Sequence, residues 1–313
     1  MAVDKNFYNQ SSASNLEWDP AWFGEKYFDD DLVIAIKKWQ RENGLLADGL
    51  VGPTTYRRIW TEREANISDH KPVQLNRRFD SNRWIIHNGK FIPIEWKKVV
   101  LWDEHGGLKT APGKYYDFSG KKDRLPTFFV NHWDVCLSSE SCAKVLARRG
   151  ASVHFCIDND GTIYQLLDTQ HGAWHAGSKK WNEKSVGVEI SNAYYTKYQN
   201  WYEKNGFGPR PVLESSWVHG NRLDPHLGFY PVQIEAARAL WKAIHTGIGI
   251  PLECPADNSG RMLTRVFNEA SRGKFEGFIH HYHLTGRKID CAGFDLASNL
   301  SVVRESPMYC LDR

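Results

Sequence analysis

The sequence predicts an α/β protein with a mixed central sheet flanked by helices, plus a small all-α, three-helix N-terminal domain. Two observations after residue 96 indicate the sheet. Short apolar runs typical of buried strands alternate with amphipathic segments. Asn159-Asp160-Gly161 separates two runs rich in β-formers, which favours a hairpin. Within residues 21–62, in contrast, apolar residues recur at helical spacing.

The composition excludes several classes of protein. The 313 residues are 41% hydrophobic and 25% charged, which is typical of a globular chain with room for two domains. No apolar run approaches the roughly 18 residues of a membrane span, so we expect no membrane insertion. A net charge of +3 without a basic stripe predicts no nucleic-acid partner. The N-terminus lacks the pattern of a secretory signal, so we expect synthesis in the cytoplasm without a signal peptide.

The N-terminal part divides by pattern into three segments. Residues 1–20 show no apolar periodicity and are interpreted as a leader. In residues 21–62, helical spacing runs to Trp39, Gly44 is a helix stop, and Thr54 is an N-cap for a second helix ending near Trp60. Residues 63–95 are charged and polar and are interpreted as a linker.

The second domain, residues 96–313, begins with a turn-rich segment that extends to about residue 125 and has no clear assignment. Beyond it we expect strands and helices in alternation. The predicted strands are 127–133, 153–158, 162–167, 185–191 and 277–280, and the predicted helices are 139–149, 233–245 and a closing segment at 294–303.

The chemistry concentrates in residues 277–291, where His280, Lys288 and Asp290 follow a short apolar strand. Such groups are costly to bury without partners, and zinc is a partner that binds His and Asp; a solvated loop is the alternative. His132 ends another strand, so His132, His280 and Asp290 would supply three ligands and leave the fourth position for a water of lowered pKa.

Two further residues complete a metal-assisted amide hydrolase. Glu189 lies among apolar residues of a strand, where it is either a salt-bridged structural acid or a general base for the attacking water. Lys288 is the candidate for stabilising the oxyanion that forms on the substrate.

Residues 33–55 carry the first family resemblance. Trp39-Gln40, Asp48-Gly49 and Gly52-Pro53-Thr-Thr resemble the peptidoglycan-binding module of many cell-wall hydrolases. The resemblance implies peptidoglycan as a partner. A generic three-helix cap on the main domain is the alternative.

Residues from about 125 to 300 carry the second resemblance. The motifs are Phe-Val-Asn-His132, Ser152-Val-His-Phe with Asp160-Gly-Thr-Ile-Tyr-Gln, Ala173-Trp-His-Ala-Gly, Ser185-Val-Gly-Val-Glu, and His280 followed by Gly286-Arg-Lys-Ile-Asp290. Together they resemble the AmpD-like zinc N-acetylmuramoyl-L-alanine amidases, which share a fold with the peptidoglycan recognition proteins. This resemblance implies that residues 96–313 form a zinc amidase domain that cleaves the amide between N-acetylmuramic acid and L-alanine.

The resemblance also implies roles for single residues: Zn²⁺ ligands at His132, His280 and Asp290, the base at Glu189 and the transition-state lysine at Lys288. Counting eight residues back from Lys288 selects His280 over His281. Cys291 replaces the family's proline after the Asp ligand, and its thiolate would compete for the metal.

Five other residues receive roles through the resemblance. Trp174, His175 and His154 are expected to bind substrate, with second-shell roles as the alternative for the two histidines and a packed structural role favoured for His154. Cys136 and Cys142 have the Cys-x5-Cys spacing of a disulfide in the peptidoglycan recognition proteins. A disulfide would place the chain in an oxidising compartment such as the bacterial periplasm. Two reduced thiols are the alternative.

Two other functions compete with the amidase: a catalytically silent peptidoglycan-binding protein, and a zinc peptidase that cuts within the stem peptide. A wall hydrolase of this kind would act in the periplasm or cell wall. It would be either a phage endolysin or an antibacterial effector injected by a secretion system. An effector would imply an immunity protein as a further partner.

Overall fold

The structure is a computed structural model that describes residues 3–67, 83–120 and 124–306. It divides into two compact units, residues 1–70 with 144–150 and residues 71–143 with 151–313. The predicted fold class is confirmed, because the second unit contains a mixed sheet with helices and the first is helical.

The N-terminal unit contains α1 (Lys5–Leu16), a 3-10 turn η1 (Pro20–Phe23), α2 (Asp30–Glu42) and α3 (Pro53–Asn66). Helix α1 occupies the segment interpreted as a leader. Asp4 caps its first turn by accepting from the Phe7 N–H. The buried Asn9 donates to the Gly49 carbonyl and accepts from the Val51 N–H. Polar tertiary contacts hold this helix, so apolar periodicity gave no signal for it.

Gln40 explains why the Trp39-Gln40 and Asp48-Gly49 motifs occur together. Its side-chain amide nitrogen donates to Asp48 Oδ1, the Leu50 carbonyl and Thr55 Oγ1, and its oxygen accepts from the Gly49 N–H. Gly49 has φ +78°, and a methyl group there would lie 2.8 Å from Val33. Gln40 therefore fixes a tight turn that only glycine fits.

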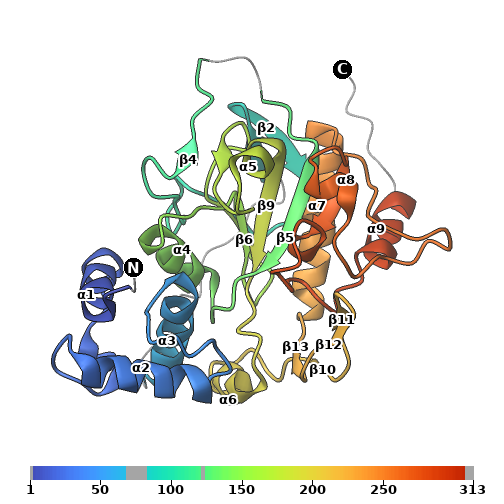
Figure 1. Cartoon of the computed structure of the whole chain (residues 1–313). Helices are drawn as coiled ribbons and strands as arrows, with labels where there is room; N and C mark the ends of the chain where they lie inside the picture. Colours follow the sequence, from blue (N-terminus) through green and yellow to red (C-terminus); the bar gives the residue numbers. More distant parts are fainter. Residues whose placement is uncertain (1–2, 68–82, 121–123, 307–313) are drawn as a thin grey trace. The chain divides into compact units, whose positions relative to one another are not determined.

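Within the described residues, six strands form the central sheet in the order β14-β5-β9-β6-β7-β3. Figure 1 shows β5, β9 and β6 at the centre of the second unit. Neighbouring strands are parallel except β6 and β7, which form the predicted hairpin. Their bounds are β3 (Val99–Leu101), β5 (Phe128–Trp133), β6 (Phe155–Ile157), β7 (Ile163–Gln165), β9 (Ser185–Ile190) and β14 (Gly277–His280).

The remaining strands form short pairs: β1 (Arg83–His87) with β2 (Lys90–Ile94), β4 (Tyr115–Tyr116) with β8 (Gly172–Ala173), β10 (Val212–Leu213) with β13 (His226–Leu227), and β11 (Trp217–Val218) with β12 (Asn221–Arg222). The helices are α4 (Ser139–Arg148), α5 (Lys179–Lys184), α6 (Gln199–Lys204), α7 (Pro231–Ile248), α8 (Asn268–Ser271) and α9 (Leu296–Glu305), with 3-10 turns η2 (Thr196–Tyr198) and η3 (His281–His283). No described helix has the length and apolarity that a membrane crossing requires.

The hairpin β1–β2 lies in the segment interpreted as a linker. Its isoleucines, Ile85, Ile86, Ile92 and Ile94, belong to the main core with α7. These few isoleucines make the packing contacts, and most other residues of the segment are charged or polar. The composition of the segment therefore indicated a linker.

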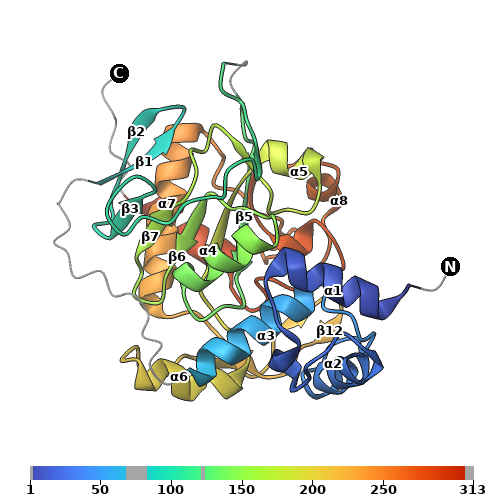
Figure 2. The same cartoon turned by 90° about the vertical axis from the view of Figure 1, so that its left-hand side faces the viewer.

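The two faces of β5 and β9 differ in what covers them. Phe129, Val186 and Val188 belong to the main core, to which α7 and α9 also contribute. Figures 1 and 2 show α7 beside the sheet. Phe128 and Val130 point to the opposite face, where they pack in a smaller apolar cluster. Because side chains alternate along a strand, His132 also belongs to this second face, beyond the edge of the cluster.

Candidate metal centre and active site

The site is built on two neighbouring strands whose register sets its geometry. Strands β5 and β9 are parallel, and His132 is the direct partner of Glu189. Partners in adjacent strands point to the same face, so both side chains project to the face opposite α7. Glu189 is 8% exposed and His132 is 2% exposed, so both groups are shielded from bulk water.

Three metal-ligating side chains meet on this face. His132 Nδ1 lies 3.0 Å from Asp290 Oδ2, and His281 Nδ1 lies 3.1 Å from the same oxygen. The ligand atoms of the three residues all lie within 4.8 Å of one another, and all three residues are buried. His281 begins η3, directly after β14, and Asp290 closes the loop that follows.

The structure places His281, not His280, in this cluster, which corrects the expected second ligand. In the register of β14 with β5, His280 is the partner of Asn131, one residue before His132. Asn131 Oδ1 accepts from Trp241 of α7, so this position faces the main core. Alternation then turns His281 to the face of His132.

His280 is held in the core by its own contacts. Its Nε2 donates to the Phe294 carbonyl at 2.9 Å, and its backbone N–H donates to His283 Nδ1 at 3.0 Å. The neighbouring Cys291 is 0% exposed and belongs to the main apolar core. Burial raises the pKa of its thiol well above the usual value, so the thiolate that would compete for a metal is disfavoured.

Electrostatics favour a neutral imidazole at His132 and an ionised carboxylate at Asp290. Burial, followed by the charge of His281, lowers the pKa of His132 to about 4. Burial alone would raise the pKa of Asp290, but the charge of His281 and the side-chain contacts with both imidazoles hold it well below its usual range. A neutral imidazole beside a carboxylate is the form that coordinates a metal.

Lys288 lies on the loop between the second histidine and the aspartate. It is half-buried, and its charge contributes to lowering the pKa of His132, so its ammonium lies within electrostatic range of the site. His219 Nε2 donates to the Lys288 carbonyl at 2.9 Å and so fixes the backbone of this loop. The predicted lysine therefore belongs to the loop that joins His281 to Asp290, and its role toward substrate stays a prediction.

The residues expected to bind substrate occupy three different settings. His175 is in contact with the cluster, because its Nδ1 lies 2.9 Å from His132 Nε2. Trp174 is half-buried and packs against Tyr116 at a centroid distance of 5.5 Å. Its role toward substrate remains a prediction.

His154 is 0% exposed and has no ring nitrogen left for a substrate. Its Nδ1 accepts from the Gly187 N–H, and its Nε2 donates to the His171 carbonyl. Burial, with the charge of Arg124, lowers its pKa to about 3. This arrangement is the packed structural role that the sequence favoured for His154.

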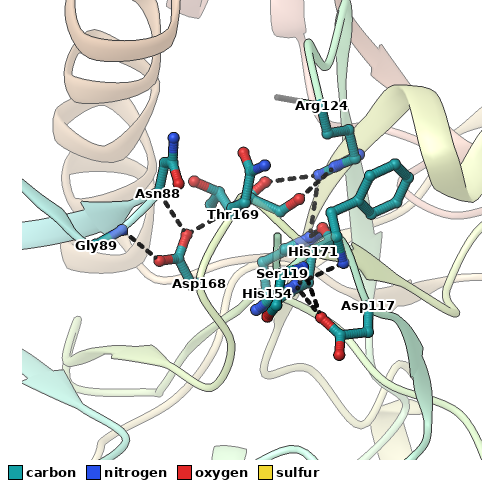
Figure 3. Close-up of polar contacts among 11 residues, drawn as sticks. Asn88, Gly89, Asp117, Ser119, Arg124, His154, Asp168, Thr169 and His171 are labelled. Carbon is teal, nitrogen blue, oxygen red and sulfur yellow. Dashed lines mark hydrogen bonds and ion pairs between the residues drawn. The ribbon is translucent and has the colours of Figure 1, made fainter. Parts of the chain in front are cut away.

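Arg124 is a structural residue for which no role was predicted. Its guanidinium donates to the carbonyls of residues 169, 170, 182, 183 and 185, and it lies 3.4 Å from His154 Nε2. Figure 3 shows Arg124 and His154 directed at the same turn around Thr169 and His171. Asp168 holds the other side of this turn by accepting from the N–H groups of Asn88 and Gly89. Burial lowers the pKa of Arg124 to about 9.

The structure has Cys136 and Cys142 as two thiols in side-chain hydrogen-bond contact, with Cys142 also in contact with Cys156. The pair is therefore in contact, in the reduced form that was the alternative, and a disulfide between the two residues stays a prediction. The sequence analysis assigned no role to Cys156.

Sequence reasoning passed over His281 and assigned no role to Arg124 or to Ser185, whose hydroxyl lies 3.0 Å from His175 Nε2. Adjacent histidines gave an ambiguity that only strand register resolves, and a single Arg in a turn-rich segment carries no motif. Ser185 had a usable signal: Ser185, Gly187 and Glu189 alternate with apolar residues, which predicts one polar face along β9.

Several solved structures resemble the chain at low identity. An AmpD derivative is 15% identical over 64% of this chain and 96% of that chain, with a TM-score of 0.33. AmpDh3 from Pseudomonas aeruginosa, in complex with an anhydromuramic pentapeptide, is 19% identical over 59% of this chain and 61% of that chain, with a TM-score of 0.33. A mutant endolysin from Bacillus subtilis is 16% identical over 61% and 88%, also with a TM-score of 0.33. No curated protein matches the sequence.

The TM-scores are too low to carry the assignment, which rests on the family models instead. Residues 23–59 match a peptidoglycan binding domain. Residues 122–290 match the family described as N-acetylmuramoyl-L-alanine amidase, and this match covers more than half of the chain and includes His132, Glu189 and Asp290. The chain belongs to the N-acetylmuramoyl-L-alanine amidase family.

Proposed function

We propose that the chain hydrolyses the amide between N-acetylmuramic acid and L-alanine in peptidoglycan, with Zn²⁺ held by His132, His281 and Asp290. The observation that carries this proposal is the convergence of two imidazole Nδ1 atoms on Asp290 Oδ2, beside a buried glutamate. Bound zinc would supply a water of lowered pKa and polarise the carbonyl of the scissile amide.

The donor set fits zinc in chemistry and in spacing. Two histidines and one aspartate are ordinary zinc ligands, and three protein ligands are typical of a catalytic rather than a structural site. Ligand bonds of about 2.0–2.1 Å in a tetrahedron separate the ligand atoms by about 3.3 Å. The distances of 3.0 and 3.1 Å to Asp290 Oδ2 are close to this value.

Glu189 acts as the general base in this proposal. It accepts a proton from the attacking water and returns it to the leaving amine of L-alanine, which balances the hydrolysis. Its main-chain position beside His132 supports the role, because the carboxyl then lies on the face of the ligand cluster. Lys288 stabilises the negative charge that develops on the carbonyl oxygen.

The N-terminal unit supports a cell-wall substrate. A domain that matches peptidoglycan-binding modules, in the same chain as an amidase, would raise the local concentration of wall-bound substrate. We therefore propose that the protein acts at the bacterial cell wall, with peptidoglycan as the common partner of both units.

The experiment is a digestion of purified sacculi by the zinc-loaded wild type and by Glu189→Gln, with bound zinc measured for both. We expect the wild type to release free stem peptides that begin with L-alanine. The variant should lose about 10²–10⁴-fold in kcat, as expected for the loss of a general base, while its zinc content is unchanged.

Other products would identify the competing functions. Binding to sacculi without any release by the zinc-loaded wild type would leave a silent peptidoglycan-binding protein. Fragments cut within the stem would instead indicate a zinc peptidase and reject the proposed bond.

A further inference from the structure

A chain of hydrogen bonds leads from His132 away from the ligand cluster. His132 Nε2 lies 2.9 Å from His175 Nδ1, and His175 Nε2 lies 3.0 Å from Ser185 Oγ. Ser185 Oγ in turn lies 2.8 Å from the Trp181 carbonyl oxygen. The chain starts at a ligand and ends at the main chain of α5.

The Trp181 carbonyl determines which atom donates and which accepts in every hydrogen bond of this series. A carbonyl oxygen only accepts, so the Ser185 hydroxyl donates to Trp181. The hydroxyl has a single hydrogen, so Ser185 Oγ must accept from His175 Nε2. Neutral His175 then has no proton on Nδ1, which accepts from His132 Nε2.

The same direction leaves His132 Nδ1 as a bare lone pair directed at Asp290 Oδ2, 3.0 Å away. Two acceptor atoms this close repel each other unless a cation lies between them. A hydrogen bond on the far nitrogen of a ligating histidine is also what fixes its tautomer and ring orientation in metal sites.

We propose that His175 and Ser185 are positioning residues for the metal: they hold His132 with its proton on Nε2 and its Nδ1 directed at zinc. This inference rests on the proposed zinc site. It assigns His175 to the support of a ligand and gives the buried Ser185 hydroxyl a function.

Strand β9 is shaped for this arrangement. A methyl group on Gly187 would lie 2.5 Å from atoms of the His175 ring, so the ring can occupy its place only above a glycine. The side-chain oxygen of Asn182 accepts from the N–H groups of His175 and Ala176 and thereby fixes the backbone that carries the ring.

The test measures zinc dissociation constants of the full chain by chelator competition. Ser185→Ala removes the terminal hydroxyl, and Ser185→Thr keeps it. Gly187→Ala displaces the His175 ring without altering any hydrogen-bonding side chain of the series from His132 to Ser185. Ser139→Ala is the matched control, because Ser139 is also 0% exposed and, among the described residues, its Oγ bonds to the hydroxyl of another serine. We expect 10–100-fold weaker zinc binding for Ser185→Ala and Gly187→Ala. Ser185→Thr and Ser139→Ala should stay within about threefold of the wild type.

A second readout needs no variant. Nitrogen-15 NMR of the imidazoles in the zinc-loaded wild type should place the His175 proton on Nε2. A proton on Nδ1 would overturn the proposal, even if Ser185→Ala failed to fold.

The outcomes separate this inference from the proposed function. A wild type that binds no zinc contradicts the proposed function itself. A wild type that binds zinc tightly, with Ser185→Ala equal to it or Ser139→Ala equally weakened, keeps the zinc site and rejects the positioning chain.

Discussion

Glu189 on β9 is the direct register partner of His132 on β5, so the predicted base and the first predicted ligand are joined by the hydrogen bonds of one sheet. Main-chain pairing of this kind varies little between conformations, unlike the placement of groups on loops. The position of the carboxyl relative to the cluster therefore depends on the length of one side chain.

Glu189→Asp tests this dependence. It keeps the carboxyl but withdraws it by one methylene, so the base no longer reaches the water in its proper orientation. We expect kcat to fall by about 10²-fold, as misplacements of about 1 Å do, with zinc affinity unchanged. Steady-state kinetics on a soluble muropeptide measure the effect. An aspartate variant as active as the wild type would exclude Glu189 as the base.

His281→Gln and His280→Gln form a matched pair that tests the second ligand. Of these two histidines only His281 contacts Asp290, so His281→Gln should lower zinc affinity by at least about 10²-fold, because a ligand is lost. His280→Gln should retain zinc, since glutamine can still donate to the Phe294 carbonyl. Metal analysis after dialysis against a weak chelator distinguishes them. The opposite ranking would restore His280 as the ligand.

Arg124→Met tests the contribution of the buried Arg124 guanidinium to stability. The methionine leaves several buried carbonyl groups without their donor, each costing about 1–3 kcal/mol. We expect the free energy of unfolding to fall by more than about 3 kcal/mol in denaturant titrations. Arg124→Lys should recover only part of this loss, because one ammonium cannot reach the acceptors that a guanidinium spans.

Because the pKa of His154 is lowered in the folded protein, we expect this residue to make the free energy of unfolding decrease in acid. Its pKa of about 3 in the folded protein lies below the usual 6.5, so between these values the unfolded chain binds a proton that the folded chain does not. Stability from this group is full above pH 6.5 and is lost as the pH falls toward 3. The slope is up to about 1.4 kcal/mol per pH unit.

The measurement for this prediction is the free energy of unfolding of wild type and His154→Gln at pH 4 to 7. The variant should be the less stable protein at pH 7, and its stability should fall less steeply with acid. Parallel curves would show that His154 is protonated in the folded protein too.

Gln40→Ala tests the turn of the N-terminal unit. It removes the donor to Asp48, Leu50 and Thr55 and the acceptor of the Gly49 N–H, so the unit should lose about 2–4 kcal/mol. We expect faster amide exchange in α2 and α3 and weaker sedimentation with sacculi. Hydrolysis of a soluble muropeptide should be unchanged. A loss of that activity as well would contradict a role confined to the N-terminal unit.

Local sequence patterns predicted the second unit well where the period was clear. The hairpin of β6 and β7 followed from Asn159-Asp160-Gly161, and α7 followed from its apolar stripe. Helix α1 and the hairpin β1–β2 were missed, because contacts from distant residues hold them in segments with little periodicity. Propensity has no access to such contacts.

The site shows the same division. Residue types and order identified His132, Glu189, Lys288 and Asp290 as neighbours to be tested. The choice between His280 and His281 depended on how β14 aligns with β5, which is a relation between strands that lie far apart in the sequence. A shift by one residue exchanges the two faces, so no count along the chain decides it.

The two faces of strand β9 have different roles. Ser185, Gly187 and Glu189 lie on the face of the proposed metal site, and Val186, Val188 and Ile190 pack in the main core. A substitution of one apolar residue by another on the core face therefore leaves the opposite face of the strand unchanged. The addition or removal of a single residue within the strand affects both faces. Such a change would turn the Glu189 carboxylate into the apolar core and turn the valines to the face of the proposed metal site. We therefore expect homologous enzymes to differ in residue type along this strand but not in its length.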